Sequence, residues 1–406
     1  MPDPGSARPG RPHLERDNQQ WIFDYLVKET GAVYHWWSDG EGSLPKGVRS
    51  HAMISKQVGK QAQRVESVAD AELAAGHRET AASLYFTAAK QYMRAQHPVF
   101  ELNDEKRFLY DSLQRCYAKV RELNSYPIER IDVPWEGSEV GGYLHLRPGG
   151  ERGPLLFYIP GSDVTAESSP DPHDNLPHQR GLHVFSFDGP GQGRSNMRGI
   201  PLTADNYERA ASAMLDHLAA RPEIDPDRVV VYGGGMGGFW AARFAAHDQR
   251  IKAAATKSSY ARKYYVLNED SPRYKQLFAF LTQARTEAEL DAIMAGMTLE
   301  GFMERIACPV LLVTGEYDHR DPIEEVYDLF DRLRVPAELW VFADQFHRSR
   351  LPGGGDTVYN LMLDWLMDRL AGRPVTNPGD VLYLDASSPG PNSPAVAKKR
   401  HWYEPG

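Results

Sequence analysis

Cysteine, long apolar runs and an excess of positive charge are all scarce in this sequence of 406 residues. Only Cys116 and Cys308 occur, each in an expected core element, so we expect buried free thiols rather than a disulfide or a metal pair. No run approaches the roughly 18 apolar residues of a membrane span, and the opening MPDPGSARPGRP has no apolar stretch typical of a signal peptide. The 46 basic against 55 acidic residues give a formal charge of −9, which argues against a nucleic-acid surface. We therefore expect a cytoplasmic protein with no nucleic-acid or membrane partner and no bound metal.

A serine is missing from the most informative stretch of the chain. Residues 229–232 form a short apolar β-branched run, a glycine-rich turn follows, and a helix of small residues opens at Phe239. Strand, sharp turn and helix together describe the nucleophile elbow of α/β-hydrolases, G-x-S-x-G. Positions 233–237 read GGGMG, so the serine's place is taken by Gly235. The sequence predicts the elbow without its nucleophile.

The same glycines also satisfy the dinucleotide fingerprint G-x-G-x-x-G at positions 233–238. That fingerprint needs an acidic residue at the end of the next strand. The next strand-like run, 251–256, ends in Lys257 and Ser258 instead, and two strand-and-turn units precede the motif. We therefore favour the elbow and expect no cofactor.

The rest of the chain divides into four parts. Residues 1–12 are rich in proline, glycine and arginine and are expected to be a flexible tail. Residues 13–124 show helical periodicity, with one helix after Gly76 and another over 105–123 that carries Phe108, Leu109, Leu113 and Tyr117. Strands alternate with helices over 125–371, which predicts an α/β fold with a mostly parallel sheet and helices on both faces. Residues 372–406 are expected to be an extended C-terminal tail.

Two polar residues follow late strands in the order that a hydrolase triad requires. Strand 310–314 is followed by Asp318, and strand 338–342 is followed by His347. In that order the carboxylate orients the imidazole, and the imidazole moves protons near neutral pH. The backbone N–H of Met236 and one from Ser162 or Asp163, after strand 155–159, are the expected oxyanion donors.

Other residues are candidates for substrate contact. Trp36 and Trp37 lie in an aromatic cluster before a glycine-rich loop, which is typical either of packing between helices or of a wall over a substrate pocket. Ser258 follows the strand after the elbow and is expected near the substrate. With Ser259 it is also the nearby alternative if the nucleophile has moved rather than vanished.

The run GLHVFSFDGPGQGRS at 181–195, the elbow, the late Asp and His, and AGHRETAASLY at 75–85 together resemble one group of α/β-hydrolases. The group includes 2,6-dihydroxypseudooxynicotine hydrolase, fungal pigment hydrolases that shorten polyketide chains, and fermentation–respiration switch esterase-like proteins. The resemblance implies that the N-terminal helical domain is a lid over the active site and that the protein is a homodimer. In the first two members it implies cleavage of a C–C bond beside a ketone. A carboxylate that contacts substrate in some relatives would fall near Glu269.

Three functions compete at this point. The first is an enzyme that uses His347 and Asp318 with an oxyanion hole but no serine nucleophile. It would act on an aryl-ketone or β-dicarbonyl compound of polyketide type by C–C hydrolysis or lysis, elimination or cyclisation. The second is a conventional serine hydrolase inactivated by a Ser-to-Gly change, and the third is a non-catalytic binding protein on a hydrolase scaffold. We favour the first because the acid and the base are both retained and glycine adopts the elbow conformation without strain.

Overall fold

The computed structural model describes residues 45, 47–259, 272–318, 320–347 and 355–406. The chain forms two compact units, and the first consists of three segments, whereas the sequence predicted one continuous helical domain over 13–124. The lid role of that helical region stays a prediction. The first unit contains Met1–Asn124, Pro190–Ala204 and Val266–Gly296, and the second contains Ser125–Gly189, Asp205–Tyr265 and Met297–Gly406.

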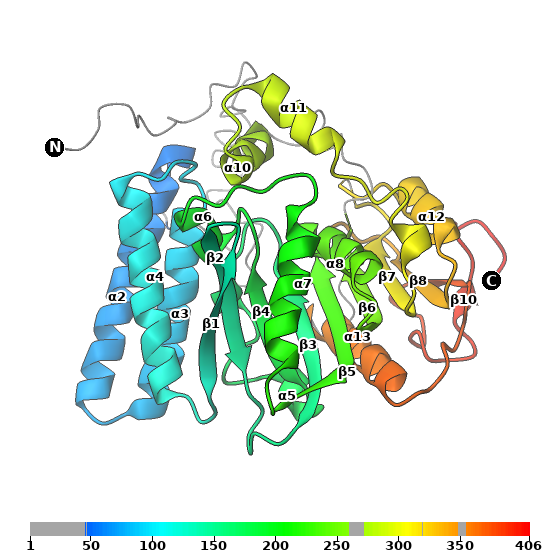
Figure 1. Cartoon of the computed structure of the whole chain (residues 1–406), viewed down its shortest axis with the longest axis horizontal. Coiled ribbons are helices and arrows are strands. Elements are labelled where there is room, and N and C mark those ends of the chain that lie inside the picture. Colours follow the sequence, from blue (N-terminus) through cyan, green and yellow to red (C-terminus); the bar gives the residue numbers. More distant parts are fainter. Residues whose placement is uncertain (1–44, 46, 260–271, 319, 348–354) are drawn as a thin grey trace. The chain divides into compact units, whose positions relative to one another are not determined.

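The first unit is helical. Helices α2 (Ile54–Ala74), α3 (Arg78–Gln96) and α4 (Asp104–Leu123) lie side by side (Figure 1). Helix α4 begins where the side chain of Asn103 accepts a hydrogen bond from Lys106 N at 2.9 Å. Leu109, Leu113 and Tyr117 of α4 are buried, whereas Phe108, which the periodicity groups with them, is half exposed. The elements of the first unit are η1 (His51–Met53), α2 (Ile54–Ala74), α3 (Arg78–Gln96), α4 (Asp104–Leu123), α6 (Gly193–Met197), α10 (Pro272–Thr282) and α11 (Glu287–Ala295).

The second unit is built on one sheet with the strand order β1-β2-β4-β3-β5-β6-β7-β8-β9-β10. Neighbours from β4 through β3 and β5 to β9 are parallel, while β1, β2 and β10 pair antiparallel. The strands are β1 (Ile128–Trp135), β2 (Ser138–His145), β3 (Gly153–Ile159), β4 (His183–Asp188), β5 (Ile224–Gly234), β6 (Ile251–Lys257), β7 (Val310–Gly315), β8 (Ala337–Phe342), β9 (Val381–Leu384) and β10 (Ala397–Lys398). The helical pieces are η2 (Ala166–Ser168), α5 (Leu176–Gln179), α7 (Asn206–Ala219), α8 (Met236–His247), η3 (Met303–Arg305), α12 (Ile323–Arg332) and α13 (Gly355–Leu370).

Alternate residues of the central strands cover opposite faces of this sheet, because successive side chains in a strand point to opposite sides. Leu156, Val230 and Trp340 belong to one buried cluster together with the apolar face of α13. Phe157, one residue along β3, contacts Phe244 of α8 instead, at 5.0 Å between ring centroids. Both faces are therefore covered by helices, as the alternation of strands and helices predicted.

The last part of the chain corrects one expectation. Residues 381–384 form β9, which pairs in parallel with β8, and residues 397–398 form β10 beside it. All four side chains of β9 are buried. The segment 372–406 therefore extends the sheet instead of forming only an extended tail.

A buried ion pair holds α8, the helix that follows the elbow. Arg243 of α8 donates from Nε to Glu208 Oε1 of α7 at 3.0 Å and from Nη1 to the Thr298 carbonyl at 3.3 Å. Its guanidinium also lies 4.0 Å from the centroid of the Phe302 ring. Because both charged side chains are almost fully buried, loss of either partner would leave the other uncompensated. Helix α8 is thereby held against α7 and the segment before η3.

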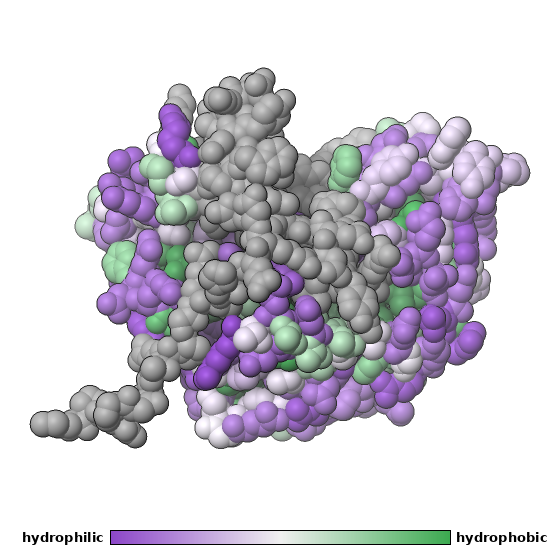
Figure 2. Space-filling view, turned by 90° about the horizontal axis from the view of Figure 1, so that it is seen from above, coloured by the Kyte–Doolittle hydropathy of each residue, from purple (hydrophilic) through white to green (hydrophobic). Residues whose placement is uncertain are grey.

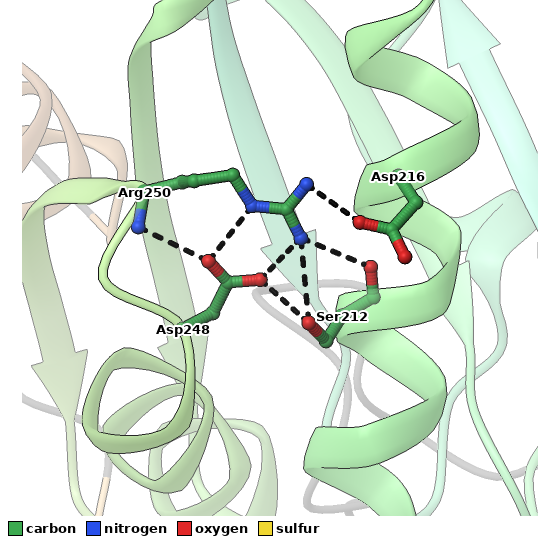
Figure 3. A network of polar contacts seen from close by, with 4 residues as sticks. All are labelled: Ser212, Asp216, Asp248 and Arg250. Atoms are coloured by element: carbon green, nitrogen blue, oxygen red, sulfur yellow. Dashed lines mark hydrogen bonds and ion pairs between the residues drawn. The ribbon is translucent and has the colours of Figure 1, made fainter.

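A second polar network ties α7 to the corner between α8 and β6 (Figure 3). Arg250 Nε donates to Asp248 Oδ1 at 2.9 Å, Arg250 Nη1 lies 2.7 Å from Asp216 Oδ1, and Ser212 Oγ donates to Asp248 Oδ2 at 2.6 Å. Burial opposes ionisation of Asp248, but its bonds from Arg250 and Ser212 outweigh that effect and hold its pKa below the usual value. Asp248 is therefore ionised and paired in the folded protein.

The surface, the helices and the two cysteines bear on what the composition predicted. Hydrophilic side chains dominate the described surface in Figure 2, and the mean hydropathy of the chain is −0.52. Within the described ranges, no helix has both the length and the apolar character needed to cross a membrane. Cys116 and Cys308 are free and buried, which confirms the expectation for both thiols.

We predict that Asp248→Asn destabilises the protein by about 2 kcal/mol at neutral pH, because the amide cannot replace the charged acceptor of Arg250. A carboxylate with a lowered folded pKa contributes stability above its ordinary value near 3.8 and loses it as pH falls through the folded value. The gap between wild type and variant should therefore close in acid. Urea unfolding from pH 7 to pH 3 measures this, and a constant gap would contradict it.

Candidate active site

The turn after β5 has the backbone of a nucleophile elbow. Gly235 precedes α8 with φ 58° and ψ −130°, a region that residues with a Cβ seldom occupy. Its N–H donates to the Lys257 carbonyl at the end of β6, at 2.8 Å, and its carbonyl accepts from Gly238 N at 2.9 Å. The elbow predicted from the sequence is therefore present in the backbone, with glycine at the position where the motif has serine.

The loops after β7 and β8 are joined to each other by their backbones. Glu316 N donates to the Phe342 carbonyl at 2.9 Å, and Tyr317 N donates to the Gln345 carbonyl at 2.8 Å. Gly315 lies so close to this second loop that a Cβ there would collide with the Gln345 carbonyl, so only glycine fits. Each loop thus fixes the position of the other.

This arrangement brings His347 and Asp318 together. His347 Nδ1 lies 2.8 Å from Asp318 Oδ2 and 3.1 Å from Oδ1, and the carboxylate has no exposed surface, while the imidazole is 17% exposed. Burial opposes ionisation of Asp318, but the hydrogen bond and charge of His347, the Ser258 hydroxyl and the Arg320 N–H outweigh it and hold its pKa below the usual value. With Asp318 ionised, Nδ1 carries the proton and Nε2 is left as the basic nitrogen.

Ser258 has a different place from the one expected. It is almost fully buried, has φ 56°, and its hydroxyl bonds to Asp318 and lies 3.4 Å from the His347 carbonyl. Its neighbour Ser259 donates from its backbone N–H to Asp321 Oδ2 at 2.7 Å. The hydroxyl of Ser258 thus contacts the acid and the backbone of the base, a position that supports the pair. Nothing in the local sequence signalled this contact, since Ser258 and Asp318 are 60 positions apart.

The end of β6 connects the elbow to the acid and the base. The Lys257 carbonyl accepts from Gly235 N, and the next residue, Ser258, reaches both Asp318 and His347. Elbow, acid loop and base loop therefore meet at the carboxyl ends of β5, β6, β7 and β8. This is the edge at which open α/β sheets bind their ligands.

The expected oxyanion donors flank the elbow. Met236 is the first residue of α8, and the early N–H groups of a helix lack intrahelical acceptors. Ser162 and Asp163 form a tight turn after β3, closed by Val164 N donating to the Gly161 carbonyl at 3.3 Å. A Cβ on Gly161 would lie 3.4 Å from the Gly234 carbonyl, which places this turn against the elbow. The oxyanion role of these residues stays a prediction.

Three candidates lie outside the described residues, namely Trp36, Trp37 and Glu269. Their contact with substrate stays a prediction. Among the side chains that the structure does place, no group of three His, Cys, Asp or Glu is arranged to hold a metal ion.

A mostly parallel sheet with helices on both faces, an elbow after β5, an acid after β7 and a histidine after β8 define an α/β-hydrolase. Comparison with protein families agrees. The profile of the family described as "Esterase FrsA-like" matches residues 60–276, and that of the prolyl oligopeptidase family matches residues 180–373. The chain belongs to the FrsA-like family of α/β-hydrolases and is an enzyme of that fold.

Individual relatives are named as hydrolases as well. The chain is 30% identical to 2,6-dihydropseudooxynicotine hydrolase of Paenarthrobacter nicotinovorans, over 77% of this chain and 84% of the relative. It is 33% identical to α/β-hydrolase xenA of Xenoacremonium sinensis, over 48% of this chain and 49% of the relative. The crystal structure of the 2,6-dihydroxy-pseudo-oxynicotine hydrolase superimposes with a TM-score of 0.69 at 25% identity, covering 80% of this chain and 92% of that one.

The structure predicts how two replacements of Ser258 differ. Ser258→Ala and Ser258→Gly both remove the hydroxyl that helps keep Asp318 ionised, so each should raise the pKa of Asp318. The His347–Asp318 hydrogen bond is lost as pH falls through that value, so it should be lost at higher pH in both variants. The imidazole N–H resonance in an acid titration follows this loss.

The glycine variant serves as the backbone control, because glycine adopts φ 56° without strain and alanine does not. Equal displacement of the titration in both variants assigns the effect to the hydroxyl. An unchanged titration in the glycine variant would assign it to the backbone.

Proposed function

We propose that this enzyme uses His347 as a general base, oriented by Asp318, without forming a covalent serine intermediate. The observation that carries the proposal is the intact hydrogen bond between Nδ1 of His347 and the buried carboxylate of Asp318 beside an elbow whose central residue is Gly235. A scaffold that only bound ligands would not require His347 and Asp318 to be paired in this geometry. The loss of the serine removes one step, acyl transfer to the protein, and leaves proton transfer in place.

The substrate class that suits this arrangement is an aryl ketone or β-dicarbonyl compound of polyketide type. Such carbonyls are activated, so a water molecule can attack them without prior acylation of the protein. A positioned base contributes about 10²–10⁴-fold, and a single oxyanion donor contributes about 10²–10³-fold. Those magnitudes suit an activated ketone better than an amide or a simple ester. The resemblance to a hydrolase of 2,6-dihydropseudooxynicotine supports the same class.

C–C hydrolysis would begin with the attack of water on the carbonyl carbon. Nε2 of His347 takes a proton from water as the hydroxide oxygen bonds to the carbonyl carbon, and the imidazolium is stabilised by Asp318. The negative oxygen of the tetrahedral intermediate is held by the N–H of Met236 and by one N–H of the turn at 162–163. Collapse breaks the bond to the neighbouring carbon, whose electron pair takes the proton from the imidazolium. The products are a carboxylic acid and a shorter compound that bears the new C–H bond. The same base can remove an acidic C–H proton, which would start an elimination or a cyclisation instead.

Replacement of His347 and of Asp318 tests their proposed roles as base and acid. With a panel of aryl 1,3-diketones as probes, His347→Ala should lower turnover by about 10²-fold or more, because it removes the base. Asp318→Asn should lower it strongly as well, because the amide disturbs the tautomer and orientation of His347. Product formation measured by liquid chromatography and mass spectrometry gives the rates.

Asp344→Asn is the matched control, since Asp344 lies on the same loop as His347 and its own φ of 56° suits asparagine. It should keep wild-type turnover. Full activity in His347→Ala would remove the imidazole from the mechanism.

Labelling by a fluorophosphonate tests whether Gly235 leaves the elbow without a nucleophile. A fluorophosphonate should leave the wild-type protein unlabelled in intact-mass measurements. Gly235→Ser should gain labelling and some activity toward p-nitrophenyl acetate, because the hydroxyl would occupy the nucleophile position of the elbow. It should also lose about 1–3 kcal/mol of stability, because serine must adopt φ 58°.

Diketone turnover decides between this proposal and an inactivated serine hydrolase. We expect turnover to fall in Gly235→Ser, because the added side chain takes the room that water or substrate uses. A many-fold rise would show that the glycine is an inactivating substitution of an ordinary serine hydrolase. Labelling of Ser258 in the wild type would show that the nucleophile has moved.

Homodimer formation and a cytoplasmic location, expected from the sequence, stay predictions beside this proposal.

A further inference from the structure

Two buried carboxyl groups lie beside the segment that carries the expected oxyanion donors. Asp188 is the last residue of β4 and the first of the motif DGPGQG, and Glu167 lies in η2, which packs against β2 and β4. Each residue is only 2% exposed. The chemistry described so far uses neither of them.

Both carboxyl groups accept hydrogen bonds from the start of η2 or from the residue just before it. Ala166 N donates to Asp188 Oδ1 at 2.8 Å, and Thr165 Oγ1 donates to Glu167 Oε2 at 2.5 Å. The Thr165 carbonyl in turn accepts from the N–H and the hydroxyl of Ser168, at 3.0 and 2.8 Å. Residues 165–168 are therefore held in place from β4 and from within.

The other end of this segment is the turn that contains Ser162 and Asp163. That turn lies against the elbow at Gly161, and Ala166 is three residues beyond Asp163. A segment of six residues, 161–166, is thus fixed at one end by the elbow and at the other by Asp188. The position of an oxyanion N–H on this segment depends on both attachments.

The groups around Asp188 determine whether its carboxyl group ionises. Burial, and then the negative charge of Glu167, raise the pKa of Asp188 well above its usual value, and Asp132 of β1 adds to the effect while the Ala166 N–H opposes it. On the α7 side the neighbour is the buried hydroxyl of Tyr207, whose pKa is raised by burial and by Asp188. The carboxyl group of Asp188 is therefore harder to ionise than an exposed one.

We propose that Asp188 and Glu167 are a pair of positioning residues that fix the segment 161–166, and with it the expected oxyanion donor at 162–163, against the elbow. The Asp188 oxygen that accepts from Ala166 N holds the far end of the segment. The part of this inference that concerns the oxyanion rests on the proposed function, and the part that concerns the pair does not.

The protonated state of Asp188 is tested by stability against pH. A carboxyl with a raised folded pKa costs stability as pH rises from its ordinary value toward the folded one. Asp188→Asn mimics the protonated group, so its unfolding midpoint relative to wild type should rise from pH 5 to pH 8.

Asp248→Asn is the matched control, because that carboxylate is ionised and paired and its replacement destabilises over the same pH range. Asp188→Asn that follows the pattern of Asp248→Asn would overturn the protonated state of Asp188.

Positioning is tested by amide hydrogen exchange of residues 161–168, which needs no substrate. Asp188→Ala leaves Ala166 N without its acceptor, so exchange over this segment should rise at least tenfold, while Asp188→Asn, which keeps an acceptor oxygen, should exchange like wild type. Unchanged exchange in the alanine variant would overturn the positioning role. If the alanine variant does not fold, faster exchange in Asp188→Asn would overturn it instead.

Kinetics then link the pair to the reaction. On an aryl 1,3-diketone that the wild type turns over, Asp188→Ala should lower kcat about tenfold or more with KM changed less than about twofold, because a misplaced donor weakens the transition state rather than binding. Asp188→Asn should restore kcat. A loss confined to KM would overturn the link to the oxyanion. Absence of turnover in the wild type would count against the proposed function alone, because exchange and stability still decide the role of the pair.

Discussion

The buried carboxylate of Asp318 is the constraint on which the rest of the site depends. An ionised group with no exposed surface is tolerated only where donors surround it, and here the donors come from different parts of the chain. His347 arrives from the loop after β8, Ser258 from the end of β6, and the Arg320 N–H from the acid's own loop. To satisfy one charge, the fold must bring three strand ends together. The histidine is oriented as part of that same requirement.

The elbow shows how a backbone can keep a conformation whose usual side chain is missing. Its N–H bonds to the Lys257 carbonyl and its carbonyl accepts from the first turn of α8, so the turn is held by its neighbours and not by the side chain at its centre. The buried Glu208–Arg243 pair anchors the helix that follows. Glycine meets this geometry at the lowest conformational cost. A glycine at this position is therefore compatible with the scaffold of the site.

The sequence predicted those features that depend on the order of short patterns. The elbow, Asp318 and His347 were found because each stands directly after an apolar strand, and in parallel sheets such positions meet at one edge. The role of Ser258 was not predicted, because its contacts join residues 60 and 89 positions apart. Nor was the placement of Glu167 beside Asp188, because carboxylates near a turn are more often exposed than buried. Strand β9 was missed because four apolar residues after a proline-rich stretch give no periodicity to distinguish a strand from a loop.

Strands β9 and β10 matter for the handling of this protein as much as for its fold. Every residue of β8 is buried, and β9 pairs along it through Leu339 to Phe342. A chain shortened after α13, at the point where the composition turns proline-rich, would leave β8 as an apolar strand with open N–H and C=O groups at the sheet edge. Such an edge recruits other strands and promotes aggregation. In the full chain the last strand has only two residues, one of them Lys398, and a short charged edge strand resists further pairing. The C-terminal segment is thus the protein's own protection against self-association through its sheet.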